Sequence, residues 1–162
     1  MPPFTVHALD LSNPAHRDAL TLLLDEYART PEGGAEALAP AVLAALPDAL
    51  AARPHYAGWV AFVDGRPAGL VNCFEGFSTF RGKPLMNVHD IIVSAPFRRR
   101  GIGRSLLDAV EHEARRRGCC KITLEVLEGN TGAVAAYLQH GFAPYALDPA
   151  MGRAQFFEKK FY

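Results

Sequence analysis

Residues 97–105 have the sequence FRRRGIGRS, the densest cluster of positive charge in the chain, with two glycines inside it. The segment before it, 85–94, is LMNVHDIIVS, and its apolar, β-branched composition predicts a strand that Pro96 ends. The segment after it, 103–117, carries its apolar residues on one helical stripe and predicts an amphipathic helix. A basic, glycine-containing loop therefore joins a strand to a helix.

This loop has the composition of an anion site. Backbone N–H groups at a helix N-terminus are free and favour a negative charge. Gly101 and Gly103 let a phosphate approach them, and the arginines at 98, 99, 100 and 104 add charge and bidentate donors. The Walker pattern and the dinucleotide fingerprint both fit poorly, the first because no lysine follows Gly103 and the second because Leu106 replaces a small residue. On the residues alone, a solvated turn explains the loop equally well.

The periodicity of the other segments predicts the fold. The remaining expected elements are a strand at 4–9, a helix from Pro14, one or two short helices within 35–53 broken near Pro40 and Pro47, strands at 55–63 and 67–77 joined by a tight turn at Asp64-Gly65, a strand at 121–127, a helix at 131–140, and short C-terminal strands at 142–145 and 155–161. Strands 85–94 and 121–127, with a helix between them, have the length of one parallel crossover. We expect an α/β (α+β) fold, with a mixed, mostly antiparallel central sheet of about 6–7 strands flanked by about four helices.

Composition narrows the class of protein. The 162 residues suit a single domain over 1–162, with 17 basic residues balancing 17 acidic ones. Zero net charge argues against a general nucleic-acid binder, and no nucleic-acid partner is expected. The N-terminus lacks a signal-peptide pattern, no stretch approaches the ~20 apolar residues of a membrane span, and the three cysteines suit a reducing compartment. We expect a cytoplasmic protein without a membrane partner or a metal.

Two motifs resemble a known family. Arg98, Gly101 and Gly103 occupy the fixed places of R-x-x-G-x-G, and residues 130–137, NTGAVAAY, have the form N-x-x-A-x-x-x-Y. Both motifs, at this spacing and with Gly141-Phe142 after the second, resemble the GNAT superfamily of N-acetyltransferases. The resemblance is close over about 85–145, and the order of the elements extends it over the whole chain.

The resemblance implies an acetyl-CoA-dependent N-acetyltransferase in which a primary amine attacks the thioester directly in a ternary complex. Its partners would then be acetyl-CoA and an amine-bearing substrate, and a homodimer is a further expectation from the family. Two other interpretations stay open: a transferase for a longer acyl-CoA, and a CoA-binding or nucleic-acid-binding module without turnover.

The resemblance also implies where acetyl-CoA is held. Backbone N–H groups of 99–104 would bind the pyrophosphate. The backbone of 91–93 would pair with the pantetheine arm, which in this family enters where two parallel strands splay, and the strands that correspond here are 85–94 and 121–127. Asn130 resembles the family's cofactor-contacting asparagine, although a helix cap explains it equally well. The residues implied at the cofactor are Ile91, Ile92, Val93, Arg98, Arg99, Arg100, Gly101, Ile102, Gly103, Arg104, Ser105, Asn130, Ala133 and Tyr137.

Three residues are implied in catalysis: Tyr137, His89 and Asp90. Tyr137 matches the tyrosine that donates a proton to the departing thiolate. A charged amine must also lose a proton, and His89 and Asp90 stand where related members carry Glu-Asp, so the identity of the base is open. Strand alternation places these two on opposite faces.

Other carboxylates are weaker candidates. Glu75 and Glu125 lie on predicted central strands, and Glu32 and Glu36 could attract a cation, although solvated loop charge is the plainer explanation for that pair. A covalent acetyl-cysteine route is not expected, because two of the three cysteines fall in a turn and the third has no histidine at a diagnostic spacing.

Overall fold

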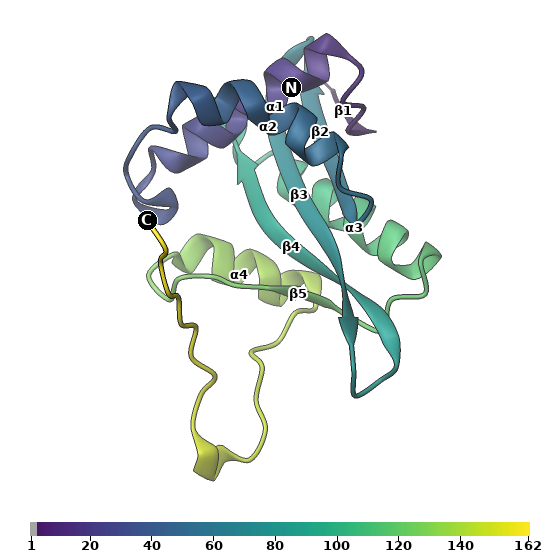
Figure 1. The fold of residues 1–162 in the computed structure, drawn as a ribbon, viewed down its shortest axis with the longest axis vertical. Helices are drawn as coiled ribbons and strands as arrows, with labels where there is room; N and C mark the ends of the chain where they lie inside the picture. Colours follow the sequence, from purple (N-terminus) through teal and green to yellow (C-terminus); the bar gives the residue numbers. More distant parts are fainter. Residues whose placement is uncertain (1–2) are drawn as a thin grey trace.

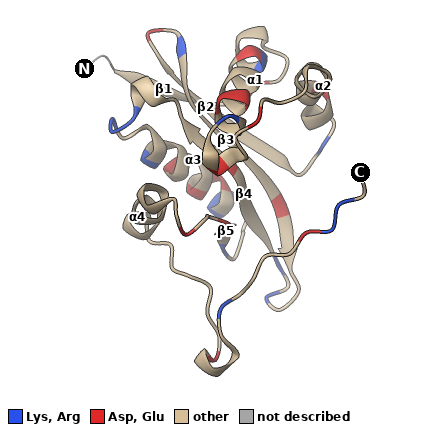
Figure 2. Ribbon diagram, turned by 90° about the vertical axis from the view of Figure 1, so that its left-hand side faces the viewer, with Lys and Arg blue, Asp and Glu red and all other residues tan. Residues whose placement is uncertain are grey.

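The computed structural model describes residues 3–162. Its elements are β1 (Phe4–Ala8), α1 (Pro14–Ala28), the 3₁₀ turn η1 (Pro31–Gly33), α2 (Pro40–Ala51), β2 (Tyr56–Val63), β3 (Arg66–Ser78), β4 (Lys83–Val93), η2 (Ala95–Phe97), α3 (Ile102–Arg116), β5 (Ile122–Leu124), α4 (Thr131–His140) and η3 (Pro149–Met151) (Figure 1). No helix within residues 3–162 has the length and apolar composition needed to cross a membrane. Basic and acidic positions are interspersed along the ribbon and do not gather on one element (Figure 2).

The sheet has the expected mixed topology. Its order is β1-β2-β3-β4-β5, with antiparallel pairing from β1 to β4 and parallel pairing between β4 and β5. Asp64 and Gly65 have φ of 48° and 73°, which is the left-handed geometry of a tight hairpin turn between β2 and β3. Helix α3 forms the crossover between the two parallel strands, as the spacing predicts.

Helices cover both faces of the sheet. On one face, α3 presents the predicted stripe to β2, β3 and β4, and its buried residues are Ile102, Leu106, Leu107, Val110 and Ala114. Gly69 of β3 allows this close packing, because a Cβ there would lie 2.8 Å from Ile102 Cγ2. On the other face, Leu20 and Leu23 of α1 pack with Leu50 of α2 against the sheet. The N-terminus of α3 is thereby fixed against β3 and β4.

Two predicted features differ from the structure. The sheet has five strands and not the predicted 6–7, because 142–145 and 155–161 form no strand within the described residues. The strand predicted at 121–127 is present as β5, but it is only three residues long. An alternating sequence gives a segment the propensity for a strand, but a strand also needs a partner edge. Pro40 begins α2 at its first turn, where a missing N–H costs nothing, but Pro47 lies inside the helix without ending it.

A β-bulge shifts the register of β4 at its central polar residues. Asn72 of β3 faces Asp90, whereas the next residue, Cys73, faces Val88, so His89 is an extra residue on β4. His89 packs edge-on against the ring of Phe74, with centroids 5.4 Å apart. Phe74 and Ile92 belong to the core under α1 and α2.

The bulge places His89 and Asp90 on the same face of the sheet. The expectation that alternation would separate them is therefore wrong. The cause is local, because an inserted residue interrupts the period of two on which that expectation depends. Both side chains lie on the face covered by α1 and α2.

Candidate active site

The site lies where β4 and β5 part. Their pairing ends at Val88 and Leu124, and β4 continues beyond it to Val93. The N–H of Ser94 donates to the carbonyl of Ala68, on the β3 side. Backbone groups of successive strand residues point to alternate sides, so the N–H and C=O of Val93 and Ile91 point the other way, into the gap between β4 and β5. The two parallel strands are splayed as predicted, and the backbone of Ile92 is turned to β3.

A cavity of about 640 Å³ fills the space between the end of β4, the loop before α3, and α4. Eleven of the fourteen residues implied at the cofactor line it: Ile91, Ile92, Val93, Arg98, Arg99, Gly101, Ile102, Gly103, Arg104, Asn130 and Ala133. Three residues that the sequence did not suggest for the cofactor, Tyr27, Thr30 and Glu32 at the end of α1 and in η1, close its far side. Arg100, Ser105 and Tyr137 do not line this cavity.

The loop before α3 turns sharply to present the helix N-terminus. Arg99 and Gly101 have φ of 62° and 83°, and Gly101 is the N-cap without a side-chain hydrogen bond. The first helical bond runs from Ser105 N–H to Gly101 C=O, at 3.0 Å. The N–H groups of the three residues between them are those that a helix cannot satisfy internally. The loop therefore has the backbone geometry of an anion cradle.

The arginines of this loop have different surroundings. Arg98 Nε donates to the carbonyl of Val93 at 3.2 Å, which ties the loop to the end of β4. The guanidinium of Arg100 lies over the ring of Phe97, 5.8 Å from its centroid, so Arg100 is directed to the core side. Arg104 stands on the first turn of α3 at the cavity wall. Arg98 shapes the loop, while Arg99 and Arg104 supply charge at the cavity.

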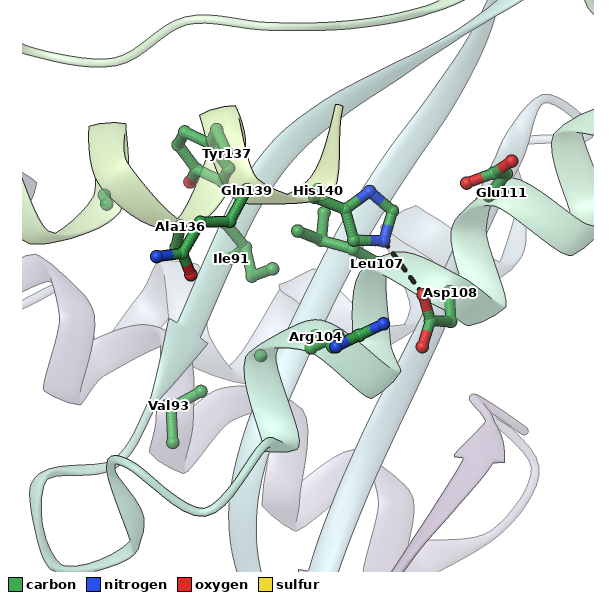
Figure 3. Close-up of a pocket in the computed structure, with 12 residues that line it drawn as sticks. Ile91, Val93, Arg104, Leu107, Asp108, Glu111, Ala136, Tyr137, Gln139 and His140 are labelled. Carbon is green, nitrogen blue, oxygen red and sulfur yellow. Dashed lines mark hydrogen bonds and ion pairs between the residues drawn. The ribbon is translucent and has the colours of Figure 1, made fainter. Parts of the chain in front are cut away.

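A second cavity, of about 460 Å³, continues the cleft between α3, α4 and β4. Figure 3 shows Gln139 and His140 of α4 across this cavity from Arg104 and Asp108 of α3, and Tyr137 of α4 also lines it. His140 Nε2 lies 2.9 Å from Asp108 Oδ1 and links the two helices. The two cavities together give the cleft an elongated shape.

Asn130 caps α4. Its side-chain oxygen accepts a hydrogen bond from the N–H of Ala133 at 3.2 Å. Asn130 also lines the large cavity, so the residue that caps α4 also faces the cleft.

Tyr137 stands where the cleft reaches the gap between the strands. Burial raises the pKa of its phenol to about 12, with a smaller contribution from Tyr27. Its ring packs against Phe142, with centroids 5.9 Å apart. The phenol therefore keeps its proton throughout the neutral range.

A third cavity, of about 320 Å³, opens beside Tyr137 on the face of α1 and α2. Its polar lining residues are Tyr27, Glu32, His89, Glu125, Asn130 and Tyr137, and Phe156 from the C-terminal segment forms part of its wall. The pKa of Tyr27 is raised by burial and then by the negative charges of Asp90 and Glu32. This acidic, half-enclosed space suits a cation.

The weaker carboxylate candidates lie in different parts of the structure. Glu125 and Glu32 line this third cavity, whereas Glu36 does not. Glu75 is engaged by Arg117, with Nη1 and Oε2 2.9 Å apart, at the C-terminal end of α3. Tyr27 and Phe156 were missed, because an apolar helix stripe and a C-terminal strand pattern carry no sign of a cavity.

A buried chain of hydrogen bonds ends on Asp90. Tyr56 Oη donates to Asn72 Oδ1 at 2.8 Å, and Asn72 Nδ2 donates to Asp90 Oδ2 at 3.1 Å. Asn72 is only 2% exposed, and Asp90 does not line the third cavity. The signal for Asn72 was present in the sequence: a single polar residue in the apolar run GLVNCF of β3.

The cysteines lie outside this chemistry. Cys73 is fully buried, and burial raises the pKa of its thiol to about 12, so it does not form a thiolate near neutral pH. Cys119 and Cys120 follow α3 at a separate cavity. Among residues 3–162, the structure contains no cluster of three or more metal-binding side chains.

These features agree with the comparison with protein families. The model of the acetyltransferase (GNAT) family matches residues 20–142 of this chain, more than half of its 162 residues. The chain therefore belongs to the GNAT family of acetyltransferases, as the two motifs predicted.

Curated relatives match the central part of the chain. A thialysine N-epsilon-acetyltransferase from Caenorhabditis elegans is 32% identical over 80 residues, which is 49% of this chain and 49% of the relative. An L-ornithine N5-acetyltransferase from Arabidopsis thaliana is 34% identical over 74 residues, 46% of this chain and 32% of the relative. The chain thus spans about half or less of the length of these relatives.

Solved structures match the fold over nearly its whole length. An aminoglycoside N-acetyltransferase, AAC(6')-Iy, in complex with CoA, superimposes with a TM-score of 0.76 at 19% identity, covering 99% of this chain and 97% of that one. At this identity the similarity establishes the architecture alone.

Proposed function

We propose that this protein is an acetyl-CoA-dependent N-acetyltransferase that transfers the acetyl group to a primary amine by direct attack in a ternary complex. The observation that carries the proposal is the joining of two cavities at Tyr137. An elongated cleft reaches this residue from the α3 N-terminus, and an acidic cavity reaches it from the α1 side. Two reactants can therefore meet at one phenol.

The chain's residues fit acetyl-CoA in the elongated cleft. The α3 N-terminus and the left-handed turn at Gly101 would hold the pyrophosphate through backbone N–H groups, with Arg99 and Arg104 supplying charge. The open backbone edge of Ile91 and Val93 would bind the pantetheine amides as an added strand does. When bound, acetyl-CoA supplies the electrophilic thioester carbonyl.

Tyr137 is the proposed acid. As the amine nitrogen forms its bond to the carbonyl carbon, the carbon–sulfur bond breaks and the sulfur leaves with the electron pair. The protonated phenol of Tyr137, with its pKa raised to about 12, gives its proton to that sulfur. A phenol that was ionised near neutral pH could not do so.

His89 is the proposed base. It lines the acidic cavity, and an imidazole can accept a proton near neutral pH. Asp90 is the next residue on the same face, and Asn72 holds its carboxylate through a hydrogen bond. The imidazole of His89 is therefore the proposed acceptor for the proton that the amine loses, with the Asp90 carboxylate next to it in the chain.

The acceptor is proposed to be a small amine with more than one cationic group. Glu32 and Glu125 line the acidic cavity at positions separate from His89, so they can bind a second cation while the first amine reacts. The named relatives act on thialysine and ornithine, and the structural neighbour acts on aminoglycosides. All of these acceptors carry several amines.

A thiol-release assay with acetyl-CoA tests this function. Diamines, dibasic amino acids and aminoglycosides are compared with monoamines of similar length. The expected result is turnover that is faster with the polycationic acceptors and that falls in Glu32→Gln and Glu125→Gln. Equal rates with monoamines and no effect of either substitution would contradict the proposed acceptor class.

A further inference from the structure

Direct attack on a thioester places negative charge on its carbonyl oxygen. As the amine nitrogen bonds to the carbonyl carbon, the π electron pair of the carbonyl moves onto the oxygen, and it returns when the carbon–sulfur bond breaks. A fixed hydrogen-bond donor at such an oxygen is usually among the largest contributions to catalysis. The acid at Tyr137 and the base at His89 leave this oxygen without a donor.

The wall shared by the two cavities is where such a donor has to lie. Five residues line both the large cavity of the elongated cleft and the acidic cavity: Tyr27, Glu32, Ile91, Asn130 and Ala133. Of these five, Tyr27 and Asn130 have side chains that can donate a hydrogen bond while Glu32 is ionised. The side-chain oxygen of Asn130 is already used to cap α4, which fixes this side chain at the helix N-terminus. Tyr27 carries the one hydroxyl of this shared wall.

Tyr27 is held rigidly in the last turn of α1. Its ring packs against the core beneath α1 and α2. Its carbonyl accepts two hydrogen bonds from Thr30, one from the backbone N–H at 2.9 Å and one from Oγ1 at 2.7 Å. A Cβ at Gly33 would overlap the same carbonyl, so the turn after α1 folds tightly over Tyr27. A donor fixed in this way does not have to reorganise when charge develops beside it.

The surroundings of Tyr27 keep its phenol protonated. Burial raises the pKa of this phenol, and the negative charges of Asp90 and Glu32 raise it further. Tyr27 in turn contributes to the raised pKa of Tyr137, an effect of charge that requires the two phenols to be near each other. Tyr27 comes from α1 and Tyr137 from α4, so two O–H donors reach the meeting point of the cavities from different elements.

We propose that Tyr27 is a further catalytic residue of the acetyl transfer, and that its O–H donates a hydrogen bond to the carbonyl oxygen of the thioester and stabilises the charge on that oxygen during attack. The proton of Tyr27 stays on the phenol throughout, whereas Tyr137 gives its proton to the sulfur. This assignment rests on the proposed function, because it requires acetyl-CoA in the elongated cleft.

The test is the carbonyl stretching frequency of an unreactive analogue bound to the full-length protein, measured by isotope-edited infrared difference spectroscopy. The analogue is the ketone in which a methylene group replaces the sulfur of acetyl-CoA. A donated hydrogen bond weakens the carbonyl bond and lowers its stretching frequency. We expect a lowered frequency in the wild type and a smaller decrease in Tyr27→Phe, which keeps the ring and its packing.

Kinetics and calorimetry provide the second readout. In Tyr27→Phe, kcat should fall about 10²-fold, because the lost bond is strongest when the oxygen is charged. The affinity for the analogue, measured by calorimetry, should fall less than about tenfold, because only a bond to a neutral carbonyl is lost there. Equal losses of kcat and affinity would overturn the assignment.

Two other tyrosine variants separate the roles. Tyr145→Phe is the matched control, because Tyr145 is 65% exposed and lines neither of the two cavities. It should keep the wild-type carbonyl frequency and kcat. Tyr137→Phe should also keep the lowered frequency while it loses turnover, because its proton serves the sulfur.

The remaining outcomes distinguish this assignment from the proposed function. An unchanged frequency in Tyr27→Phe would overturn the role of Tyr27, and a change in Asn130→Asp instead would give that role to the amide of Asn130. In both cases the analogue still binds, so the proposed function stands. No binding of the analogue to the wild type would overturn the proposed function and, with it, the role of Tyr27.

Discussion

Asn72 and Asp90 face each other across β3 and β4, and the amide of Asn72 donates a 3.1 Å hydrogen bond to the Asp90 carboxylate at the bulge that brings His89 to the same face. This hydrogen bond holds the Asp90 carboxylate in place next to His89. Replacing Asn72 with leucine removes that donor. We expect kcat/KM to fall about tenfold while the affinity for CoA stays within about threefold of wild type.

The control for this prediction is Asn87→Leu. Asn87 is on β4 and donates to Thr123 Oγ1 at 3.1 Å, outside the acidic cavity. Its loss should lower stability without lowering kcat/KM. An unchanged kcat/KM in Asn72→Leu, or the same decrease in both variants, would mean that Asn72 only supports the core.

Tyr137→Phe tests the proton donor. The ring is retained, so the affinity for CoA should change less than about threefold, while kcat falls about 10²-fold or more. Because burial raises the pKa of Tyr137 to about 12, the wild-type profile should show no limb from this phenol below about pH 10. Steady-state kinetics and calorimetry with CoA measure the two effects. Tyr162→Phe, at the exposed chain end, should behave as wild type.

His89→Gln tests the base. An amide of similar size cannot accept the proton of the amine, so kcat/KM should fall about 10²-fold. Activity should return partly at high pH, where the free amine is already neutral. His112→Gln, on the exposed face of α3, is the matched histidine control. A wild-type value of kcat/KM in His89→Gln would transfer the role to Asp90 or to water.

Gly101→Ala tests the backbone cradle. Gly101 has φ of 83°, and a side chain in that region costs about 1–2 kcal/mol. Relief of the strain would turn the N–H groups of α3 away from the cavity, so CoA should bind at least about tenfold more weakly. Arg104→Gln, which removes one exposed charge, should weaken binding less than this. Calorimetric titration with CoA compares the two variants.

Gly82→Ala supplies the control for strain alone. Gly82 has φ of 61° in the β3–β4 hairpin, and a Cβ added there would meet no neighbouring atom within 4 Å. The variant should lose similar stability and keep normal CoA affinity. If Arg104→Gln weakened CoA more than Gly101→Ala, side-chain charge and not backbone geometry would hold the ligand.

The ion pairs of Glu113 make the free energy of unfolding depend on pH in the acid range. Arg116 and Arg117 both hydrogen-bond to it at 2.7 Å and lower its pKa to about 2. The unfolded chain then binds more protons than the folded one between about pH 4.5 and pH 2, so this contribution is complete above pH 4.5 and is lost as the pH falls through 2. Urea unfolding of Glu113→Gln should show a flatter acid dependence than wild type. A parallel curve would contradict the pairing.

The sequence predicted the parts of the site that depend on local pattern. The loop at Arg98–Arg104 and the cap at Asn130 follow from residue types that each need a particular backbone geometry, and the structure has them at one cavity. The helix boundaries of α3 and α4 follow from periodicity and from the glycine that ends each helix. Local chemistry was sufficient for these features.

Features that depend on pairing between distant segments were not predicted. The bulge at His89 arises from the register of β4 against β3, and alternation within one strand cannot reveal an extra residue. The C-terminal segment 155–161 has the pattern of a strand, but whether a strand forms depends on an available edge. The acidic cavity is lined by residues of α1, β4, β5 and the C-terminal segment, so no single segment carries its signal.

The most direct test of the central claim is a single measurement of acetyl transfer with the purified full-length protein. Acetyl-CoA and a panel of primary amines are incubated with it, and free CoA thiol and N-acetylated amine are quantified together by mass spectrometry. We predict equal amounts of both products with at least one polycationic amine, and none above background in the double variant Tyr137→Phe, His89→Gln. CoA binding with no N-acetylated product from any amine in the panel would contradict the assignment of this protein as an N-acetyltransferase.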